Sequence, residues 1–149
     1  MSIEQRYFPI DLQPDVAVGI KIPWTRLDGV LFNQSYSTID QLLSNVKNLI
    51  LTRQGERVMQ PLFGTNLQDS LFEQNTESLR SSIRNSISRA IEFWLPYVSI
   101  DRLDVEPVIA VLGHDEEHGA KVVLYISLNG QQAEQPITFL VTPSGVELI

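Results

Sequence analysis

Leu51-Thr52-Arg53-Gln54-Gly55-Glu56-Arg57-Val58-Met59-Gln60-Pro61-Leu62-Phe63-Gly64 is the stretch of this sequence that separates its elements most clearly. It lies between two amphipathic segments, yet it contains two glycines, a proline and three charged residues. Because proline lacks a backbone N–H and glycine weakens helices and strands, the stretch cannot simply continue either neighbour. We predict a shaped connection here and call residues 51–64 the connector.

Helical periodicity is present on both sides of the connector. Thr38 and Gln41 have the form of a capping box at the start of the first helix. Asn66 can cap a short second helix, Thr76 can cap a longer third one, and Pro96 ends it. The apolar stripes are Ile39, Leu42, Leu43, Val46, Leu49 and Ile50 in the first helix, and Leu79, Ile83, Ile87, Ala90, Ile91 and Trp94 in the third. The sequence therefore predicts three helices.

After Pro96 the apolar residues alternate with polar ones, which is typical of strands with one buried face. The three predicted strands carry Leu103 and Val105, then residues 122–128, then residues 137–141. Asn129-Gly130 lies in a loop that favours a hairpin between the second and third strands. We therefore expect an α+β fold in which three helices pack on one face of a small antiparallel β-meander.

The domain prediction is an extended N-terminal arm over residues 1–36 and a single α+β domain over residues 37–149. Prolines and glycines punctuate the arm, which has short apolar stretches but no helical period. Disorder of the residues before Val16 is the alternative. A length of 149 residues with 43% hydrophobic content suffices for one core. No run is apolar enough to be a membrane span, and Met1–Arg6 lacks the core of a signal peptide.

Charge and cysteine content narrow the possible functions. The net charge of −7 opposes binding to nucleic acid or to an anionic membrane, and we predict neither as a partner. The sequence has no cysteine, which excludes disulfides, thiolate metal sites and cysteine nucleophiles.

Two groups of residues are candidates for catalysis or metal binding. His114-Asp115-Glu116-Glu117-His118 has the residue order of an inverted zinc-peptidase motif, but it lies between two glycines without helical periodicity and is better interpreted as a solvated acidic loop. A glycosidase needs two suitably placed carboxylates. The spacing of the acids with apolar neighbours singles out no pair among Glu56, Asp69, Glu73 and Glu92. We predict no catalytic residue, no metal and no cofactor.

The connector resembles a pattern of the small baseplate wedge proteins of contractile-tailed bacteriophages: leucine-x-threonine-arginine-x-glycine-glutamate-arginine, then proline, then phenylalanine-glycine. Gly19-Ile20-Lys21-Ile22-Pro23-Trp24 resembles the entry segment of the same family, with Trp24 in place of the more usual phenylalanine. The resemblance extends from about Gly19 to Leu103. This family also carries an old lysozyme-like label and includes the sheath initiator of related injection machines.

The resemblance implies a structural protein of a contractile tail that joins the baseplate wedge to the sheath and templates sheath assembly. A peptidoglycan-degrading, lysozyme-like tail enzyme is the alternative. The implied partners are baseplate wedge proteins and the tail sheath protein, with the tail tube protein as a further candidate, and the protein would form a ring of copies. Its location would be the baseplate of the virion, after assembly in the host cytoplasm. A viral tail and a bacterial relative of one both stay open.

The resemblance also indicates two sets of partner-binding residues. The set expected to contact the wedge core bundle is Arg53, Glu56, Arg57, Pro61, Phe63, Gly64 and Pro96. Only Pro96 remains of the family's glutamate-proline-arginine motif, so an apolar contact is expected there. The alternative is a rigid connector in which Glu56 and Arg57 pair with helix ends and Phe63 fills the core.

The second set is expected to accept a strand from the sheath protein at an open sheet edge. It consists of Gln135, Ile137, Phe139 and Val141. Pro136 cannot donate a ladder hydrogen bond, and this predicts that the strand lies at the border of the sheet.

Overall fold

The computed structural model describes residues 9–13, 15–23, 32–70, 77–109, 118–142 and 144–149. The chain divides into two compact units, Met1–Asn48 and Leu49–Ile149. None of the described helices is long and apolar enough to cross a membrane. The predicted domain boundary after residue 36 stays a prediction.

The first unit contains a 3-10 helix, η1 (Pro9–Leu12), and a two-stranded antiparallel ribbon of β1 (Gly19–Ile20) and β2 (Gln34–Ser35). Short strands are thus present in the predicted arm. The Asp11 carboxylate accepts hydrogen bonds from the backbone amide and the hydroxyl of Thr38, each at 2.8 Å. These bonds attach η1 to the first turn of the following helix.

The first long helix, α1 (Thr38–Leu51), is capped differently from the prediction. Ser37 is the N-cap, because its hydroxyl accepts from the Asp40 amide at 3.2 Å. The capping box between Thr38 and Gln41 is wrong: the Gln41 side chain accepts from the Ser35 hydroxyl at 2.6 Å instead. The adjacent residues Ser37 and Thr38 both carry hydroxyls, and the sequence pattern alone placed the cap one residue too late.

The second unit contains one further long helix, α3 (Glu77–Trp94), and a single turn, α2 (Leu67–Ser70). The prediction of three helices is therefore wrong in number: the described residues contain two long helices, α1 and α3. The expected short helix reaches only four residues within the described part of the chain, and its expected continuation lies outside it. The predicted end of α3 before Pro96 is confirmed.

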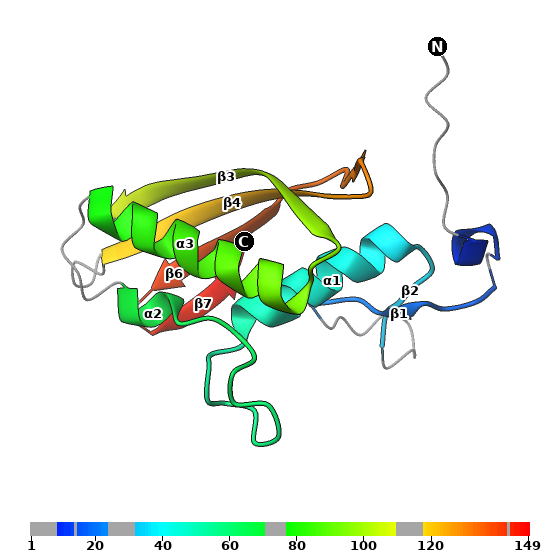
Figure 1. Ribbon diagram of the computed structural model, residues 1–149, viewed down its shortest axis with the longest axis horizontal. Helices are drawn as coiled ribbons and strands as arrows, with labels where there is room; N and C mark the ends of the chain where they lie inside the picture. Colours follow the sequence, from blue (N-terminus) through cyan, green and yellow to red (C-terminus); the bar gives the residue numbers. More distant parts are fainter. Residues whose placement is uncertain (1–8, 14, 24–31, 71–76, 110–117, 143) are drawn as a thin grey trace, which may run out of the picture. The chain divides into compact units, whose positions relative to one another are not determined.

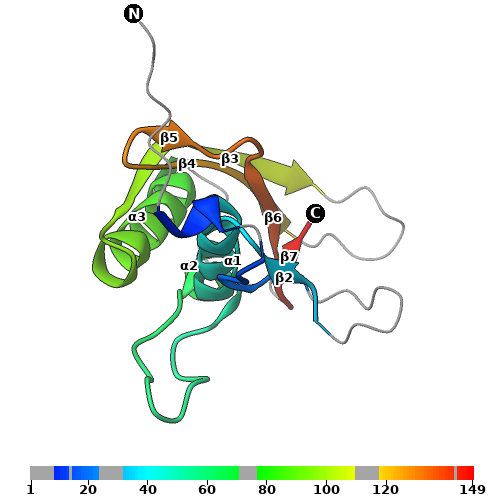
Figure 2. The same cartoon turned by 90° about the vertical axis from the view of Figure 1, so that its right-hand side faces the viewer.

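The second unit also carries an antiparallel sheet, which confirms the predicted fold class. Its strands are β3 (Val98–Ile109), β4 (His118–Leu128), β6 (Ile137–Thr142) and β7 (Gly145–Leu148), hydrogen-bonded in the order β3-β4-β6-β7. In Figure 1 the colours follow the chain from the N-terminus to the C-terminus, and in Figure 2 α3 lies on one face of the sheet. The predicted apolar stripe of α3 is buried except for Trp94, which is half-buried, and the alternating apolar residues of β4 and β6 are buried.

The hairpin after β4 is tighter than predicted. β5 (Gln131–Gln132) turns back on β4, so that Leu128 pairs with Gln131 across a two-residue turn. Asn129 and Gly130 have φ values of 51° and 84°, the left-handed conformation that such hairpin turns require. The chain then leaves β5 and returns to β4 as β6.

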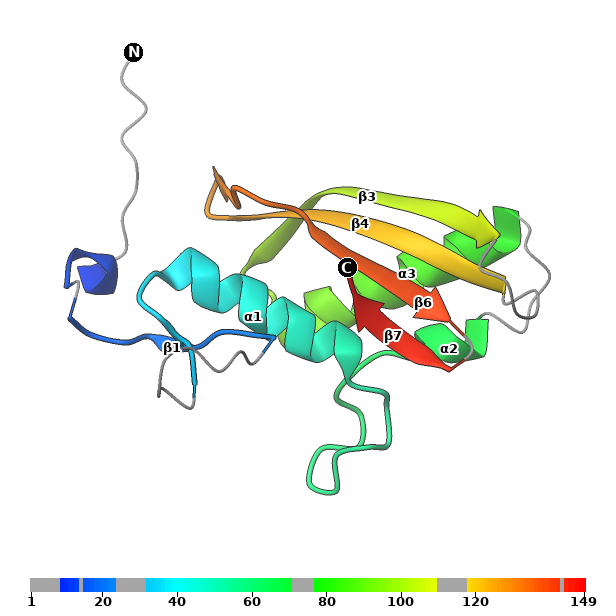
Figure 3. The same cartoon turned by 180° about the vertical axis from the view of Figure 1, so that it is seen from behind.

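The position of β6 in the sheet contradicts the prediction of a border strand. β6 pairs with β4 on one side and with β7 on the other, as Figure 3 shows from behind. Pro136 lies just before β6 and therefore does not interrupt a ladder. The four residues Gly145-Val146-Glu147-Leu148 are short for a sequence-based strand assignment, and they cover the edge that was expected to be open.

Candidate docking site at the connector

The two ends of the connector are tied together by backbone hydrogen bonds. The Thr65 amide donates to the Thr52 carbonyl at 2.9 Å, and the Gln54 amide donates to the Thr65 carbonyl at 3.3 Å. The buried Thr65 hydroxyl donates to the carbonyl of Ile50 at 3.1 Å, which satisfies an acceptor in the last turn of α1. We call Thr52, Gly64 and the adjacent Thr65, where the connector joins the rest of its unit, the neck.

Both glycines of the connector are required by its geometry in different ways. Gly64 has φ of +113° and is buried, and a Cβ there would overlap the carbonyl oxygen of Thr52. Gly55 has φ of +92°, but a Cβ there would meet nothing within 4 Å. The Gly55 amide donates to the Pro61 carbonyl at 2.8 Å, which closes the outer part of the loop.

The charged residues of the connector are engaged within the chain. The Arg53 guanidinium lies 3.0 Å from the Asp69 carboxylate on α2. Glu56 accepts a hydrogen bond from the backbone amide of Arg53 at 3.0 Å. The Arg57 guanidinium lies over the Phe63 ring, 3.8 Å from its centroid, in cation–π geometry. These contacts support the alternative of a rigid connector more than that of freely projecting arginines.

Phe63 links the connector to the end of α3. Its ring lies edge-on to Trp94, with 5.2 Å between ring centroids. Pro96, which follows Trp94 after one residue, is exposed. The structure thus brings Arg57 and Phe63, two residues of the predicted wedge-binding set, to the last turn of α3. The other members, Arg53, Glu56, Pro61 and Gly64, lie along the connector itself.

The outer part of the connector exposes apolar side chains. Val58 is 93% exposed and Met59 is 92% exposed, and Leu62 nearby is 70% exposed. Figures 1 and 3 show the connector projecting away from α2, α3 and the sheet of its own unit. We call Val58 and Met59 the tip of the connector. The sequence alone does not single out these two residues, because their apolar character predicts burial as readily as exposure.

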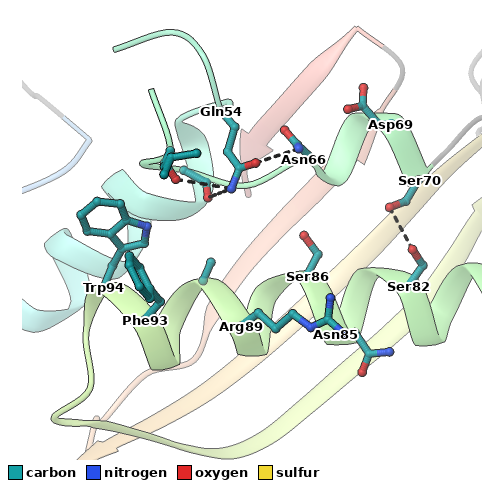
Figure 4. Close-up of a pocket in the computed structure, with 13 residues that line it drawn as sticks. Gln54, Asn66, Asp69, Ser70, Ser82, Asn85, Ser86, Arg89, Phe93 and Trp94 are labelled. Atoms are coloured by element: carbon teal, nitrogen blue, oxygen red, sulfur yellow. Dashed lines mark hydrogen bonds between the residues drawn. The ribbon is translucent and has the colours of Figure 1, made fainter. Parts of the chain in front are cut away.

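A groove of about 660 Å³ lies between the connector and α2 on one side and α3 on the other, as Figure 4 shows. Many of its polar groups bond to each other. The Gln54 side chain donates to the carbonyls of Leu62 and Gly64, both at 3.4 Å, and accepts from Asn66 at 2.8 Å. The hydroxyls of Ser70 and Ser82 are 3.2 Å apart at the α2 end. The first three bonds hold the two sides of the connector together and reach Asn66 before α2, and the last joins α2 to α3.

The acids considered for catalysis that the structure describes do not converge on this groove. Among its lining residues the only carboxylate is Asp69, which pairs with Arg53, whereas glycoside hydrolysis usually needs two. Glu92 is exposed on α3, and Glu73 lies outside the described residues. The described residues contain no cluster able to hold a metal ion, and of the motif at residues 114–118 only the backbone of His118, in β4, is described.

The predicted sheath-binding residues occupy unexpected positions. Ile137, Phe139 and Val141 are buried in the core, and Gln135 is exposed just before β6. Because β6 pairs on both sides, its backbone offers no open edge between Phe139 and Thr142. Within the described residues the borders of the four-stranded path are β3 and β7, and the two-residue β5, which pairs only with β4, lies off this path.

The two borders of the sheet differ in how they resist strand addition. β3 contains Pro107, an irregular register between Ile100 and Arg102, and a carbonyl at Leu103 that accepts from Arg84 of α3 at 3.4 Å. Bulges, prolines and covering groups are common protections of an edge strand. β7 has no proline or register shift, so it is the less protected border.

The connector, the helices beside it and part of the sheet fall in the segment that decides the family. The profile of the baseplate wedge protein gp25 family matches residues 37–133, more than half of the chain. The chain belongs to this family. As a member it is a structural component of the baseplate of a contractile tail, where its partners are other baseplate subunits. No curated protein shows a significant sequence match.

Solved structures share the fold at low sequence identity. A chain of the anti-feeding prophage baseplate has a TM-score of 0.59 at 18% identity, over 73% of this chain and 82% of that one. A candidate tail lysozyme from Geobacter sulfurreducens has 0.55 at 19%, over 71% and 89%. A chain of the postcontracted pyocin R2 baseplate has 0.54 at 19%, over 70% and 98%. At these identities the likeness concerns the fold.

Proposed function

We propose that this baseplate protein joins the wedge to the tail sheath and templates the first ring of sheath subunits by accepting a sheath strand at β7. The observation that carries the proposal is the difference between the two sheet borders: β3 contains a proline and a register shift, whereas β7 has neither and keeps a regular ladder with β6. An extended arm can add to such a border by backbone hydrogen bonding. The sheath-binding surface thus moves from β6 to β7.

The register of β7 identifies its outward donors. The Ile149 amide donates to the Thr138 carbonyl at 3.1 Å, and Leu140 pairs with Glu147 two residues further along the ladder. Because antiparallel ladders alternate, the Glu147 amide points toward β6 and the amides of Val146 and Leu148 point outward. These two donors are available to a strand added at this border.

The connector supplies the second attachment in this proposal, the one to the wedge. It is a rigid projection beside the end of α3, and it contains six of the seven residues that the family resemblance indicates for wedge contact. The seventh, Pro96, is exposed at the end of α3. Separate attachment surfaces on the connector and on the sheet border allow one chain to hold two partners at once.

Proline substitution in β7 tests the sheath proposal. Val146→Pro removes an outward donor and keeps an apolar side chain, whereas Glu147→Pro removes a donor to β6 and serves as the matched control for internal damage. We expect Val146→Pro to fold, to enter baseplates and to abolish sheath polymerisation on them, and we expect Glu147→Pro to lower Tm more. Normal sheath nucleation by folded Val146→Pro protein in baseplates would show that β7 is not the template.

A further inference from the structure

We propose that Val58 and Met59 form an apolar plug that inserts into a socket on a neighbouring wedge subunit. The inference rests on the proposed attachment of the connector to the wedge, and it specifies which side chains make that attachment. It also differs from the expectation based on the family pattern, in which Arg53 and Arg57 would contact the partner.

The exposure of the tip is the first argument. Val58 and Met59 are adjacent in sequence, and at 93% and 92% they are the two most exposed large apolar residues in the described part of the chain. Leu62, at 70%, adds apolar surface on the same loop. Single exposed apolar residues are ordinary, but a contiguous group on a projecting loop marks a contact surface. Methionine also adapts its shape to the pocket that receives it.

The second argument is that the charges of the connector already have partners inside the chain. Arg53 pairs with Asp69, Glu56 accepts from the Arg53 backbone, and Arg57 stacks on Phe63. A partner that bound these arginines would first have to break the contacts. Val58 and Met59 can be buried without any such loss, so the favourable free energy of docking comes from apolar burial.

The connector already has a defined shape before any partner binds. The neck hydrogen bonds and the Gly55–Pro61 bond hold the loop in one shape, which the two glycines at positive φ permit. Ordering a flexible loop on binding weakens affinity, and a loop that is already ordered avoids that cost. The connector therefore presents its tip as a rigid projection, which suits insertion into a preformed socket.

The charge of the chain identifies the kind of partner. A net charge of −7 makes two copies of this chain repel each other at close range, which disfavours a second copy as the occupant. The same charge favours a different subunit whose apolar socket has a neutral or basic rim. The proposed occupant is therefore a wedge subunit of that surface chemistry.

The first experiment compares binding of labelled protein to baseplate wedges assembled without this chain. Val58→Ser/Met59→Ser should fold with an unchanged Tm, because both side chains are exposed, and should bind at least about tenfold more weakly, as expected for losing the burial of two apolar side chains. Leu12→Ser is the matched control: Leu12 is an apolar residue, 70% exposed, outside the connector. It should bind like wild type.

The outcomes separate the two proposals. If wild-type protein does not bind the wedges, the proposed attachment to the wedge is wrong, and the plug with it. If wild type binds and the Val58→Ser/Met59→Ser protein binds equally well, only the plug is wrong. If Arg53→Ala/Arg57→Ala protein folds but loses more affinity than the tip variant, the plug is wrong and the arginines make the main contact with the wedge.

The second experiment uses the absence of cysteine from the sequence. Met59→Cys introduces a single thiol that a maleimide labels rapidly in the free protein. In assembled baseplates the thiol should be protected, and a short photoactivatable cross-linker on it should capture a different subunit. Equal labelling in both states would overturn the proposal, as would cross-linking between two copies of this chain.

Discussion

The neck and the tip of the connector lie only a few residues apart, but their environments are opposite. In the neck, Gly64 and Thr65 are buried, and hydrogen bonds from backbone amides, from the Thr65 hydroxyl and from the Gln54 side chain hold them in place. At the tip, Val58 and Met59 are almost entirely exposed. The neck therefore contributes to the stability of this chain, whereas the tip contributes little to it. Substitutions in the two regions should accordingly separate unfolding from loss of docking.

The largest expected effect is at Gly64 in the neck. We expect Gly64→Ala to lower the free energy of unfolding by about 3 kcal/mol, because backbone strain of about 1–3 kcal/mol is added to a steric overlap with the Thr52 carbonyl of similar size. Urea denaturation measures the change. A loss below about 1 kcal/mol, the scale of an ordinary glycine substitution, would mean that the neck can relax and is not rigid.

Thr65 should show the next largest effect. Thr65→Val removes the buried hydroxyl that donates to Ile50, and we expect a loss of about 2 kcal/mol in the free energy of unfolding, since an acceptor is left unsatisfied. Thr65→Ser keeps the hydroxyl and is the matched control. A loss from Thr65→Val no larger than that from Thr65→Ser, which lacks only the methyl group, would mean that the hydrogen bond to Ile50 contributes no more than the packing of one methyl group.

Sequence patterns were sufficient for the parts of this molecule that are regular. The apolar stripe of α3 and the alternation in β4 and β6 repeat often enough to define a face, and all three are confirmed. The hairpin at Asn129-Gly130 was predictable because few residues accept two consecutive positive φ values. Periodicity averaged over many residues is robust against a single unexpected contact.

The parts that were mispredicted depend on few residues or on distant partners. β7 has four residues, too few for alternation to stand out, and missing it made β6 look like a border strand. The cap of α1 at Ser37 depends on choosing between adjacent hydroxyl residues. In the connector, the pairing of Arg53 with Asp69 and of Arg57 with Phe63 requires the tertiary fold, and so does the exposure of the tip.

Gly55 gives a second test of the difference between the neck and the outer part of the connector. It shares the positive φ of Gly64 but lies in the exposed outer part. Gly55→Ala should cost about 1 kcal/mol, from the left-handed backbone alone, since its Cβ would meet no atom within 4 Å. Gly55→Asn is the control, because asparagine tolerates this conformation better. If urea denaturation finds Gly55→Ala as damaging as Gly64→Ala, the difference between neck and outer loop is wrong.

The smallest effect on stability is expected for the ion pair between Arg53 and Asp69. Both side chains are about half exposed, at 50% and 54%, so solvent screens their attraction. A double-mutant cycle with Arg53→Ala and Asp69→Ala should give a coupling of about 0.2–1 kcal/mol, which decreases as salt is raised. Thermal or urea unfolding at low and high ionic strength measures it.

Arg53→Ala and Asp69→Ala also decide whether Arg53 stabilises the connector, as the neck does, or contacts the partner, as we propose for the tip. If Arg53 only positions the connector, Arg53→Ala and Asp69→Ala should weaken wedge binding by the same small factor, because each breaks the same intramolecular contact. If Arg53 instead contacts the partner, Arg53→Ala should weaken binding much more than Asp69→Ala, which would leave the guanidinium free to reach outward. We expect equal, small effects, and a large difference between the two would place Arg53 in the docking surface beside Val58 and Met59.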